Sequence, residues 1–161
     1  AVLCRLKYPF HVVNYFLDPA KAGDASIQFM CGVLYELGLD IPQSHVRAFQ
    51  YFKLAANQGL AKAQYEVASH YLRITKKQEA LEYMLLAANQ GYLPALLMLA
   101  YRYEKGMDIK ESPEKALEYY KKAFKICENH PCYVEHQLFI KKKLLIYQKA
   151  LPQKQALLKK K

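Results

Sequence analysis

Apolar residues recur at steps of three and four positions along most of the chain. In residues 61–73 the pattern Ala-x-Ala-Gln-Tyr-x-Val-Ala-x-x-Tyr places Val67 and Tyr71 on the same helical face as three alanines. Residues 93–105 and 25–37 carry the same pattern. Each copy predicts an amphipathic helix. A second periodic segment follows each copy, and we predict these second helices near residues 44–57, 77–89 and 113–128.

The segments repeat as units. Ala-Ala-Asn-Gln-Gly at residues 55–59 returns unchanged at residues 87–91, and an eroded copy is centred on Tyr15 and Phe16. Periods of roughly 20–50 residues are typical of solenoids. We therefore predict an all-α solenoid of stacked antiparallel helix pairs, forming a single domain over residues 1–161. Its parts are a partial repeat over 8–23, repeats over about 24–59, 60–91 and 92–129, and a capping helix with a basic tail over 132–161.

Turn residues and small residues mark the joints of each repeat. Gly38 and Gly106 are expected to end first helices in the left-handed conformation, and Ser112 to cap the helix that begins at Pro113. Gly59 and Gly91 are expected to end second helices in the same way. The middle connection lacks four residues and should turn more tightly. Small residues recur where the paired helix should cross closely, at Gly32, Ala68 and Ala100.

The last predicted helix carries one apolar stripe and a polar side. We expect its inner face to hold Tyr133, Ile140, Leu144, Tyr147 and Leu151, and its outer side to be supplied largely by the lysines at 141–143. Pro152 is expected to end it.

Composition agrees with an all-α fold and argues against a membrane span. More than half of the residues are hydrophobic, tryptophan is absent, and Thr75 is the only threonine, so the β-branched residues that strands favour are scarce. The longest apolar run, residues 93–101, is about half the length that crosses a bilayer. The chain begins at Ala1 without an initiator methionine or a leader pattern. We interpret it as an excised fragment or a processed product.

The positive charge is concentrated at one end. Of the net charge of +10, residues 141–161 contribute +8, because they hold eight lysines and no acidic residue. Such a tail is either a solubilising end or a site for an anionic membrane surface or an acidic partner. Nucleic-acid binding is disfavoured, because no aromatic-rich RNA module or helix-turn-helix pattern accompanies the lysines.

The repeat resembles the Sel1-like repeat, a relative of the tetratricopeptide repeat. The resemblance lies in the first-helix pattern, the glycine-led loop and the motif Ala-x-x-Tyr-x-x-x-Ala-Ala-Asn-Gln-Gly, over residues 12 to about 128. Asp40 and Asp108 depart from it where the family usually has a second glycine, and Ser44 and Ser112 where it usually has aspartate. The resemblance implies a right-handed α-solenoid that acts as an adaptor in multiprotein complexes.

The same resemblance, together with the lysine- and tyrosine-rich composition, suggests a source and a compartment. We expect a soluble protein of a bacterium that lives in eukaryotic cells. It would be either an effector secreted into the host cell or an adaptor of the bacterial cytoplasm or periplasm.

Catalytic chemistry is not predicted. The chain holds no glycine-rich phosphate loop, no zinc-protease motif and no serine-hydrolase motif. We therefore expect no enzyme activity, no cofactor and no small-molecule substrate. Cys127, His130, Cys132 and His136 could form a zinc site or a disulfide across the turn, but two ordinary thiols are the favoured interpretation and no metal site is assigned. The tyrosines 15, 51, 83 and 119 are interpreted as helix packing rather than a ligand ladder.

The predicted binding site is the concave surface, which first helices line in solenoids of this type. A partner protein or peptide would bind there; the alternative function is a peripheral membrane adaptor that uses the basic C-terminus. An alternative for the first of these helices is that Met30, Val33, Leu34 and Leu37 pack on residues 1–20 or on a missing upstream repeat. The predicted site residues are Met30, Leu34, Leu37, Glu66, His70, Arg73, Met98, Tyr101, Arg102 and Lys105.

Overall fold

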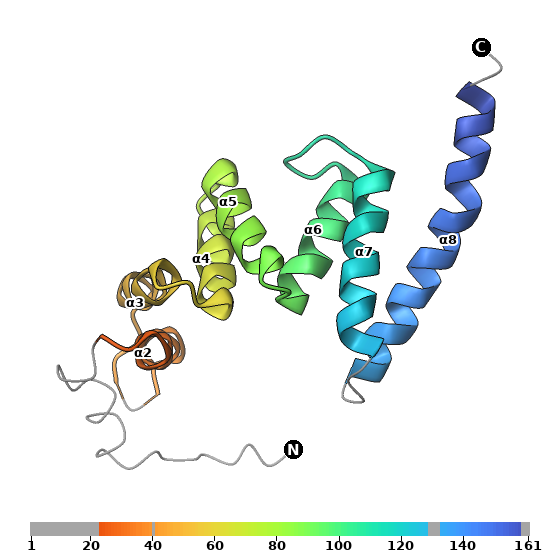
Figure 1. Cartoon of the computed structure of the whole chain (residues 1–161). Helices are drawn as coiled ribbons and strands as arrows, with labels where there is room; N and C mark the ends of the chain where they lie inside the picture. The colour runs from red at the N-terminus through yellow and green to blue at the C-terminus, as the bar shows by residue number, and fades with distance from the viewer. Residues whose placement is uncertain (1–22, 40, 129–132, 159–161) are drawn as a thin grey trace. The chain divides into compact units, whose positions relative to one another are not determined.

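The computed structural model describes residues 23–39, 41–128 and 133–158, with side chains up to Ala150 and at Pro152. This part of the chain is helical and holds no strand. Its helices (Figure 1) are α2 (Ala25–Leu37), α3 (His45–Asn57), α4 (Ala61–Arg73), α5 (Lys77–Asn89), α6 (Leu93–Lys105), α7 (Pro113–Glu128) and α8 (Val134–Leu158). The predicted all-α fold and the six predicted repeat helices are confirmed. The predicted partial repeat over 8–23 lies outside the described residues, apart from Gly23.

The chain divides into two compact units, and the division falls within α5. In the first unit, Ala1–Tyr83, α2 packs against α3 and α3 packs against α4. In the second unit, Met84–Lys161, α6 packs against α7 and α7 packs against α8. Each unit therefore buries its apolar stripes by stacking neighbouring helices, as repeat proteins do.

Glycine ends the first helices as the sequence predicts. Gly38 and Gly106 adopt φ values of +66° and +63°, and their backbone N–H groups donate to the carbonyls of Leu34 and Arg102. Ser112 caps α7, because its Oγ accepts from the N–H of Lys115 at 3.3 Å. The middle connection is tighter, since α4 ends at Arg73 and α5 begins at Lys77. Thr75 takes a positive φ of 61° in this turn, a strained conformation for a β-branched residue.

Small residues allow the helices of a pair to approach closely. A Cβ placed on Gly32 would lie 2.5 Å from the ring of Phe52, so only glycine fits between α2 and α3 at this point. Ala68 and Ala100, which hold the same position in the later repeats, are completely buried. The close crossing predicted from the sequence is confirmed directly at Gly32.

Tyrosines fill the same place in successive repeats. Tyr51 stacks on Tyr35 with ring centroids 5.7 Å apart, and Tyr119 stacks on Tyr103 at the same distance. In the middle repeat the Tyr71 and Tyr83 rings lie 5.8 Å apart. The interpretation of these residues as packing is therefore confirmed for Tyr51, Tyr83 and Tyr119, whereas Tyr15 lies outside the described residues.

The capping helix differs from its prediction in length. It continues through Pro152 to Leu158 instead of ending at the proline. Proline removes one helical hydrogen bond, to the carbonyl four residues earlier, but its fixed φ is itself compatible with a helix. Pro152 and Gln148 are both exposed, so that carbonyl can bond to water. The predicted helix end was wrong because an exposed site tolerates the lost bond.

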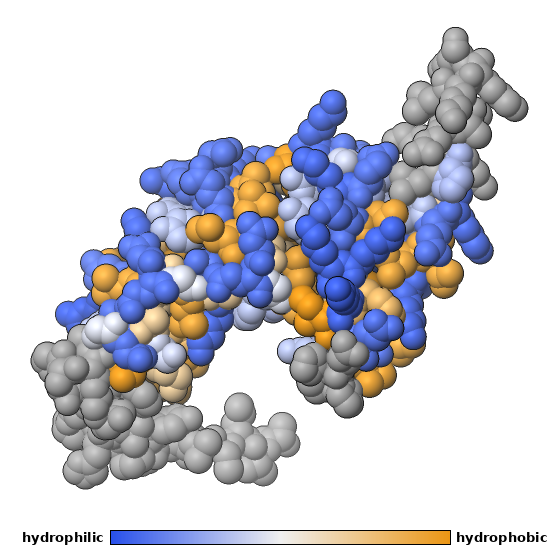
Figure 2. Space-filling view, in the orientation of Figure 1, coloured by the Kyte–Doolittle hydropathy of each residue, from blue (hydrophilic) through white to orange (hydrophobic). Residues whose placement is uncertain are grey.

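The outer side of α8 also differs from its prediction. Ile140 and Tyr147 are buried on the inner face as expected, but Lys143 is half-buried. Large apolar side chains are exposed instead, among them Leu138 (65%) and Leu145 (58%). Figure 2 shows apolar atoms on the surface along this helix. The expectation of a largely polar outer side is therefore wrong, since lysines and apolar residues alternate around it.

The crossing positions provide a stability test. We expect Ala68→Leu or Ala100→Leu to lower the free energy of unfolding by about 1–3 kcal/mol, because a larger side chain overpacks a completely buried site. The matched control is Lys121→Leu, which places the same side chain at an exposed position of α7 and should change stability by less than about 0.5 kcal/mol. Chemical denaturation measures all three. Equal stability of the three variants would show that the crossing is not close.

Candidate functional site

The predicted residues of α2 do not all reach the surface. Met30 and Leu37 are exposed, whereas Leu34 is only 6% exposed and belongs to the core. The placement of Leu34 in the binding site is corrected. Leu34 lies on the same side of α2 as Cys31 and Tyr35, which are also buried. The buried side of α2 is therefore wider than the sequence pattern indicates.

The predicted polar residues of α4 are joined to one carboxylate from α2. Both terminal nitrogens of Arg73 lie 3.3 Å from Glu36 Oε1. The other oxygen, Oε2, lies 3.1 Å from Nδ1 of His45 and 3.5 Å from Nε2 of His70. Glu36 therefore ties together α2, α3 and α4. Glu36 and His45 were not predicted as site residues, because they are far from α4 in the chain. The recurrence of Tyr-Glu-x-Gly at residues 35–38 and 103–106 is the sequence signal that could have identified Glu36.

The hydrogen-bond geometry of this cluster sets a protonation state. Arg73 donates to Nε2 of His70 at 2.8 Å, and an arginine nitrogen cannot accept, so the His70 ring is neutral in this arrangement. Burial lowers the pKa of His70, and the positive charge of Arg73 lowers it further. Burial alone would raise the pKa of Glu36, but hydrogen bonds from His45 and Arg73 outweigh it and hold that pKa below its ordinary value.

Glu66 lies half-buried in the same region. Burial, followed by the charge of Glu36, raises the pKa of Glu66. The first unit thus presents exposed apolar residues on α2 and a cluster of paired charges between α2, α3 and α4. Of its predicted residues, the structure brings Glu66, His70 and Arg73 together around Glu36.

In the second unit the predicted residues separate into surface and core. Tyr101 is 44% exposed, Lys105 is exposed, and Met98 is half-buried one turn earlier on α6. Arg102 is only 9% exposed and pairs with Asp108, with 2.6 Å between Arg102 Nη1 and Asp108 Oδ2. The placement of Arg102 in the binding site is therefore corrected.

The reason for this correction lies in the loop after α6. Asp108 has a φ of +62°, which aspartate tolerates better than most residues, and the loop folds its carboxylate back onto α6. In the sequence, Asp108 stands out only as a departure from the usual glycine. The structure shows that this departure provides the partner that buries Arg102.

A second shared carboxylate joins the capping helix to the last repeat. Glu104 Oε1 accepts from Lys143 Nζ at 2.6 Å, and Oε2 accepts from the Tyr120 hydroxyl at 2.8 Å. Burial alone would raise the pKa of Glu104, but the bonds from Lys143 and Tyr120 lower it. Burial and the Glu104 charge raise the pKa of Tyr147 to about 12. This network links α6, α7 and α8.

The repeat type is identified by a match to a known protein family. The Sel1 repeat model matches residues 25–60, 61–92 and 93–125. The chain belongs to the Sel1 repeat family. Each match corresponds to one helix pair, the third ending three residues before the end of α7, and α8 lies beyond it. Sel1 repeat proteins generally act as scaffolds for protein–protein interaction.

Solved structures carry the same fold. A Sel1 repeat protein from Oxalobacter formigenes has 25% identity and a TM-score of 0.66, and the match covers 74% of this chain and 51% of that protein. The protective antigen c5321 of uropathogenic Escherichia coli, which displays an SLR fold, has 22% identity and a TM-score of 0.61. Its match covers 84% of this chain and 32% of that one. The chain thus spans about half and one third of these proteins. No curated protein matches the sequence.

The Sel1 repeats and the cap show no metal centre in the residues that the structure describes. Of the cysteine and histidine cluster considered above, Cys127 is buried and His136 is exposed. His130 and Cys132 lie outside the described residues, so a disulfide between Cys127 and Cys132 is not tested. None of the described helices combines the length and the apolar character needed to cross a membrane.

The Glu36 cluster predicts an effect of pH on stability. His70 has a lowered pKa in the folded protein, so the unfolded chain binds a proton more readily. The melting temperature should therefore fall as the pH drops below about 6.5, the ordinary pKa of histidine. Glu36, whose pKa is lowered from 4.5, should affect stability only at more acidic pH.

The control for this prediction is His70→Gln, whose amide oxygen can still accept from Arg73. Thermal melts at pH 7.5 and 5.5 should show a smaller difference in this variant than in the wild type. An identical difference in the two proteins would show that His70 is not the group responsible.

Proposed function

We propose that this Sel1 repeat protein is an interaction scaffold that binds a partner protein or peptide through the exposed faces of its first helices. In the second unit this face is formed by Met98, Tyr101 and Lys105 of α6. The observation that carries the proposal is the exposure of Tyr101 beside Met98 and Lys105. Tyrosine and methionine are enriched in protein interfaces, because they offer large or adaptable contact areas.

The first unit supports the same function with a different surface. Met30 and Leu37 provide exposed apolar area on α2. Arg73 is exposed but already bonded to Glu36, so an acidic partner would compete with an internal carboxylate for it. We therefore assign a larger share of the binding energy to the face formed by Met98, Tyr101 and Lys105, called the Tyr101 surface below. Because the two solved structures described above are bacterial proteins, we also propose a bacterial adaptor, with a secreted effector as its alternative.

The Tyr101 surface can be tested by substitution. We expect Met98→Ala with Tyr101→Ala to weaken the binding of a captured partner by at least about 2 kcal/mol, because exposed aromatic anchors dominate interfaces. The melting temperature should change little, since Tyr101 is exposed and Met98 is half-buried. Calorimetry with the purified partner measures the affinity.

The matched control changes two exposed lysines of α7, Lys121→Ala with Lys125→Ala, and should leave the affinity unchanged. A greater loss in this control than in the Met98/Tyr101 variant would move the binding site to the second helices.

A second candidate function, peripheral membrane association, is favoured by the outer side of α8. Leu138 and Leu145 are seven residues apart and Val134 lies one turn before Leu138, so the three form one exposed ridge. Exposed Lys141 and Lys142 lie beside this ridge. A helix with an apolar ridge and flanking lysines suits the interface of an anionic membrane, where apolar groups insert and lysines reach the lipid phosphates.

Liposome flotation tests this candidate. The full chain should float with phosphatidylserine-containing vesicles and not with neutral phosphatidylcholine vesicles, and Leu138→Ser with Leu145→Ser should abolish flotation. The control is Val46→Ser with Leu86→Ser, which removes two equally exposed apolar side chains elsewhere. Flotation of the Leu138/Leu145 variant at the wild-type level would exclude the ridge as the membrane contact.

A further inference from the structure

The first and third repeats carry the same tyrosine and cation arrangement on their helix hairpins. The Tyr35 and Tyr51 rings are nearly parallel, at 11°, and so are the Tyr103 and Tyr119 rings, at 9°. In each repeat a cation four residues before the second tyrosine lies over the ring of the first. The Arg47 Cζ is 5.4 Å from the Tyr35 centroid, and the Lys115 Nζ is 5.1 Å from the Tyr103 centroid.

An open cavity lies against each of these arrangements. In the first repeat it has a volume of about 480 Å³ and is lined by Tyr35, Arg47 and Tyr51, with Leu54 as an apolar wall. In the third repeat it has a volume of about 520 Å³ and is lined by Tyr103 and Lys115, with Ile109 as the wall; Lys110, Glu111, Ser112 and Glu114 complete the lining. Both cavities therefore include an aromatic surface, one aliphatic side chain and a cation, and the third-repeat cavity also includes a second lysine and two carboxylates.

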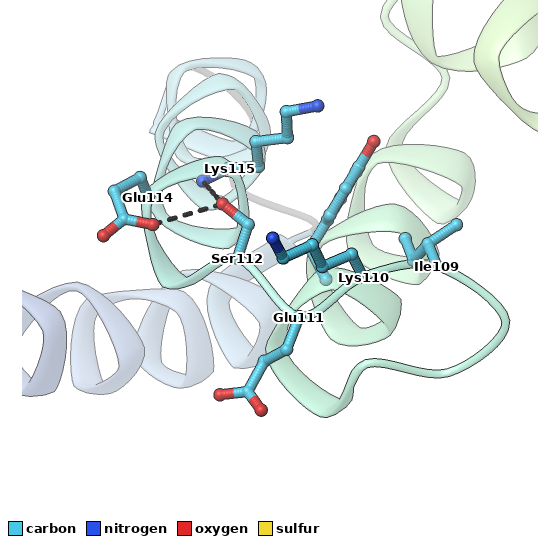
Figure 3. A pocket seen from close by; sticks show the side chains of 7 residues that line it. Ile109, Lys110, Glu111, Ser112, Glu114 and Lys115 are labelled. Atoms are coloured by element: carbon cyan, nitrogen blue, oxygen red, sulfur yellow. Dashed lines mark hydrogen bonds between the residues drawn. The ribbon is translucent and has the colours of Figure 1, made fainter.

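The cations of these two cavities have no carboxylate partner among the residues that the structure describes. Arg47 donates to the Tyr35 hydroxyl at 3.3 Å. Neither Arg47 nor Lys115 forms an ion pair with a described residue. Figure 3 shows the Glu111 side chain pointing away from Lys110 and Lys115. Glu114, which also lines the third-repeat cavity, lies 3.2 Å from the Ser112 hydroxyl through its Oε2 and forms no ion pair with Lys115. Arg47 and Lys115 can thus each pair with a ligand, although the two glutamates offset part of the positive charge at the third repeat.

The middle repeat shows what a carboxylate does at this place. Glu79 occupies the sequence position of Arg47 and Lys115. Lys76, which lies 5.9 Å from the Tyr71 centroid, pairs with Glu79 at 3.6 Å. The middle repeat therefore pairs its cation internally, whereas Arg47 and Lys115 of the other two repeats form no ion pair with a described residue.

The rims of both cavities are held in place by the fold. The N–H of Ser44 donates to the Tyr35 carbonyl at 2.9 Å, and the N–H of Ser112 donates to the Tyr103 carbonyl at the same distance. In the third repeat the ion pair between Arg102 and Asp108 also fastens the loop that carries Ile109. A preformed rim lowers the entropy cost of binding.

We propose that each of these two cavities is a docking site for the same kind of extended peptide segment, in which an acidic side chain is followed by an aliphatic one. The tyrosine and the cation are equivalent in the two repeats, whereas Leu54 and Ile109 come from different repeat positions. The carboxylate pairs with Arg47 or Lys115, as Glu79 pairs with Lys76 in the middle repeat. The aliphatic side chain packs on Leu54 or Ile109 and on the tyrosine rings. This inference rests on the proposed scaffold function but assigns a second surface, on the helix hairpins, and the chemistry of the partner.

The test uses the full ¹⁵N-labelled chain and three probes. These are the acetylated peptide Gly-Ser-Asp-Leu-Glu-Leu-Ser-Gly, the same peptide with lysine in place of both acids, and inorganic phosphate. The acidic peptide should shift amide resonances around both cavities in a saturable manner. Lys115→Glu should weaken binding at the third repeat by at least about tenfold and leave the shifts around Tyr35 unchanged, because charge reversal replaces attraction by repulsion.

Arg47→Glu should weaken binding at the first repeat and leave the shifts around Tyr103 unchanged. In each variant the unaltered cavity then shows that the protein is still folded. Leu54→Ser and Ile109→Ser, both with their cations intact, should each weaken binding at their own cavity by at least about threefold. If the acidic peptide shifts neither cavity, if the lysine peptide binds equally well, or if neither charge reversal matters, the proposal is wrong. Shifts with phosphate as large as those with the acidic peptide would also overturn it, since they would indicate simple anion binding.

One further variant separates this proposal from the scaffold function. Met98→Ala with Tyr101→Ala should leave the binding of the acidic peptide unchanged. Loss of peptide binding in this variant would place the peptide on α6, which would overturn the hairpin site and keep the proposed function.

Discussion

The structure depends on the close approach of the two helices in each repeat. Gly32 leaves room for the Phe52 ring, and a single added carbon would collide with it at 2.5 Å. Ala68 and Ala100 are completely buried at the same repeat position. With small residues at the crossing, the paired helices pack tightly and long side chains are directed to the repeat edges, where tyrosines stack. The binding surfaces proposed on the repeats lie on helices that this packing holds in place.

The repeats differ from one another in a few charged residues near their turns. Glu36 gathers Arg73, His70 and His45 in the first unit, and Asp108 fastens Arg102 in the second. Charged groups that are partly withdrawn from water need partners, so these carboxylates decide which neighbouring cations stay available. The repeats therefore have similar cores but different charged residues near their turns. This division suits a scaffold, because partners can be distinguished by the charges without any change in the fold.

Helix α8 combines a buried inner face with an outer face that exposes large apolar side chains. Ile140, Tyr147 and the pair of Lys143 with Glu104 fasten it to the last repeat. Its outer side exposes Leu138 and Leu145 among lysines, whereas the side of a helix that faces only water is expected to be polar. An exposed apolar ridge of this kind is typical of a surface that binds another molecule or a membrane. The lysines beside it favour an anionic partner. The hairpin cavities and this ridge present positive charge beside apolar groups, in different geometries.

The sequence by itself determined the helices of the repeats, because apolar periodicity, capping serines and left-handed glycines are local signals that act within a few residues. Gly38, Gly106 and Ser112 behave as predicted for this reason. Only the tertiary structure decided that Leu34 and Arg102 are buried and that Glu36 meets His70 and Arg73. These outcomes depend on partners from other helices or from a folded loop. A periodic pattern shows which way a side chain points along its own helix, but it cannot show what the neighbouring helix places opposite it.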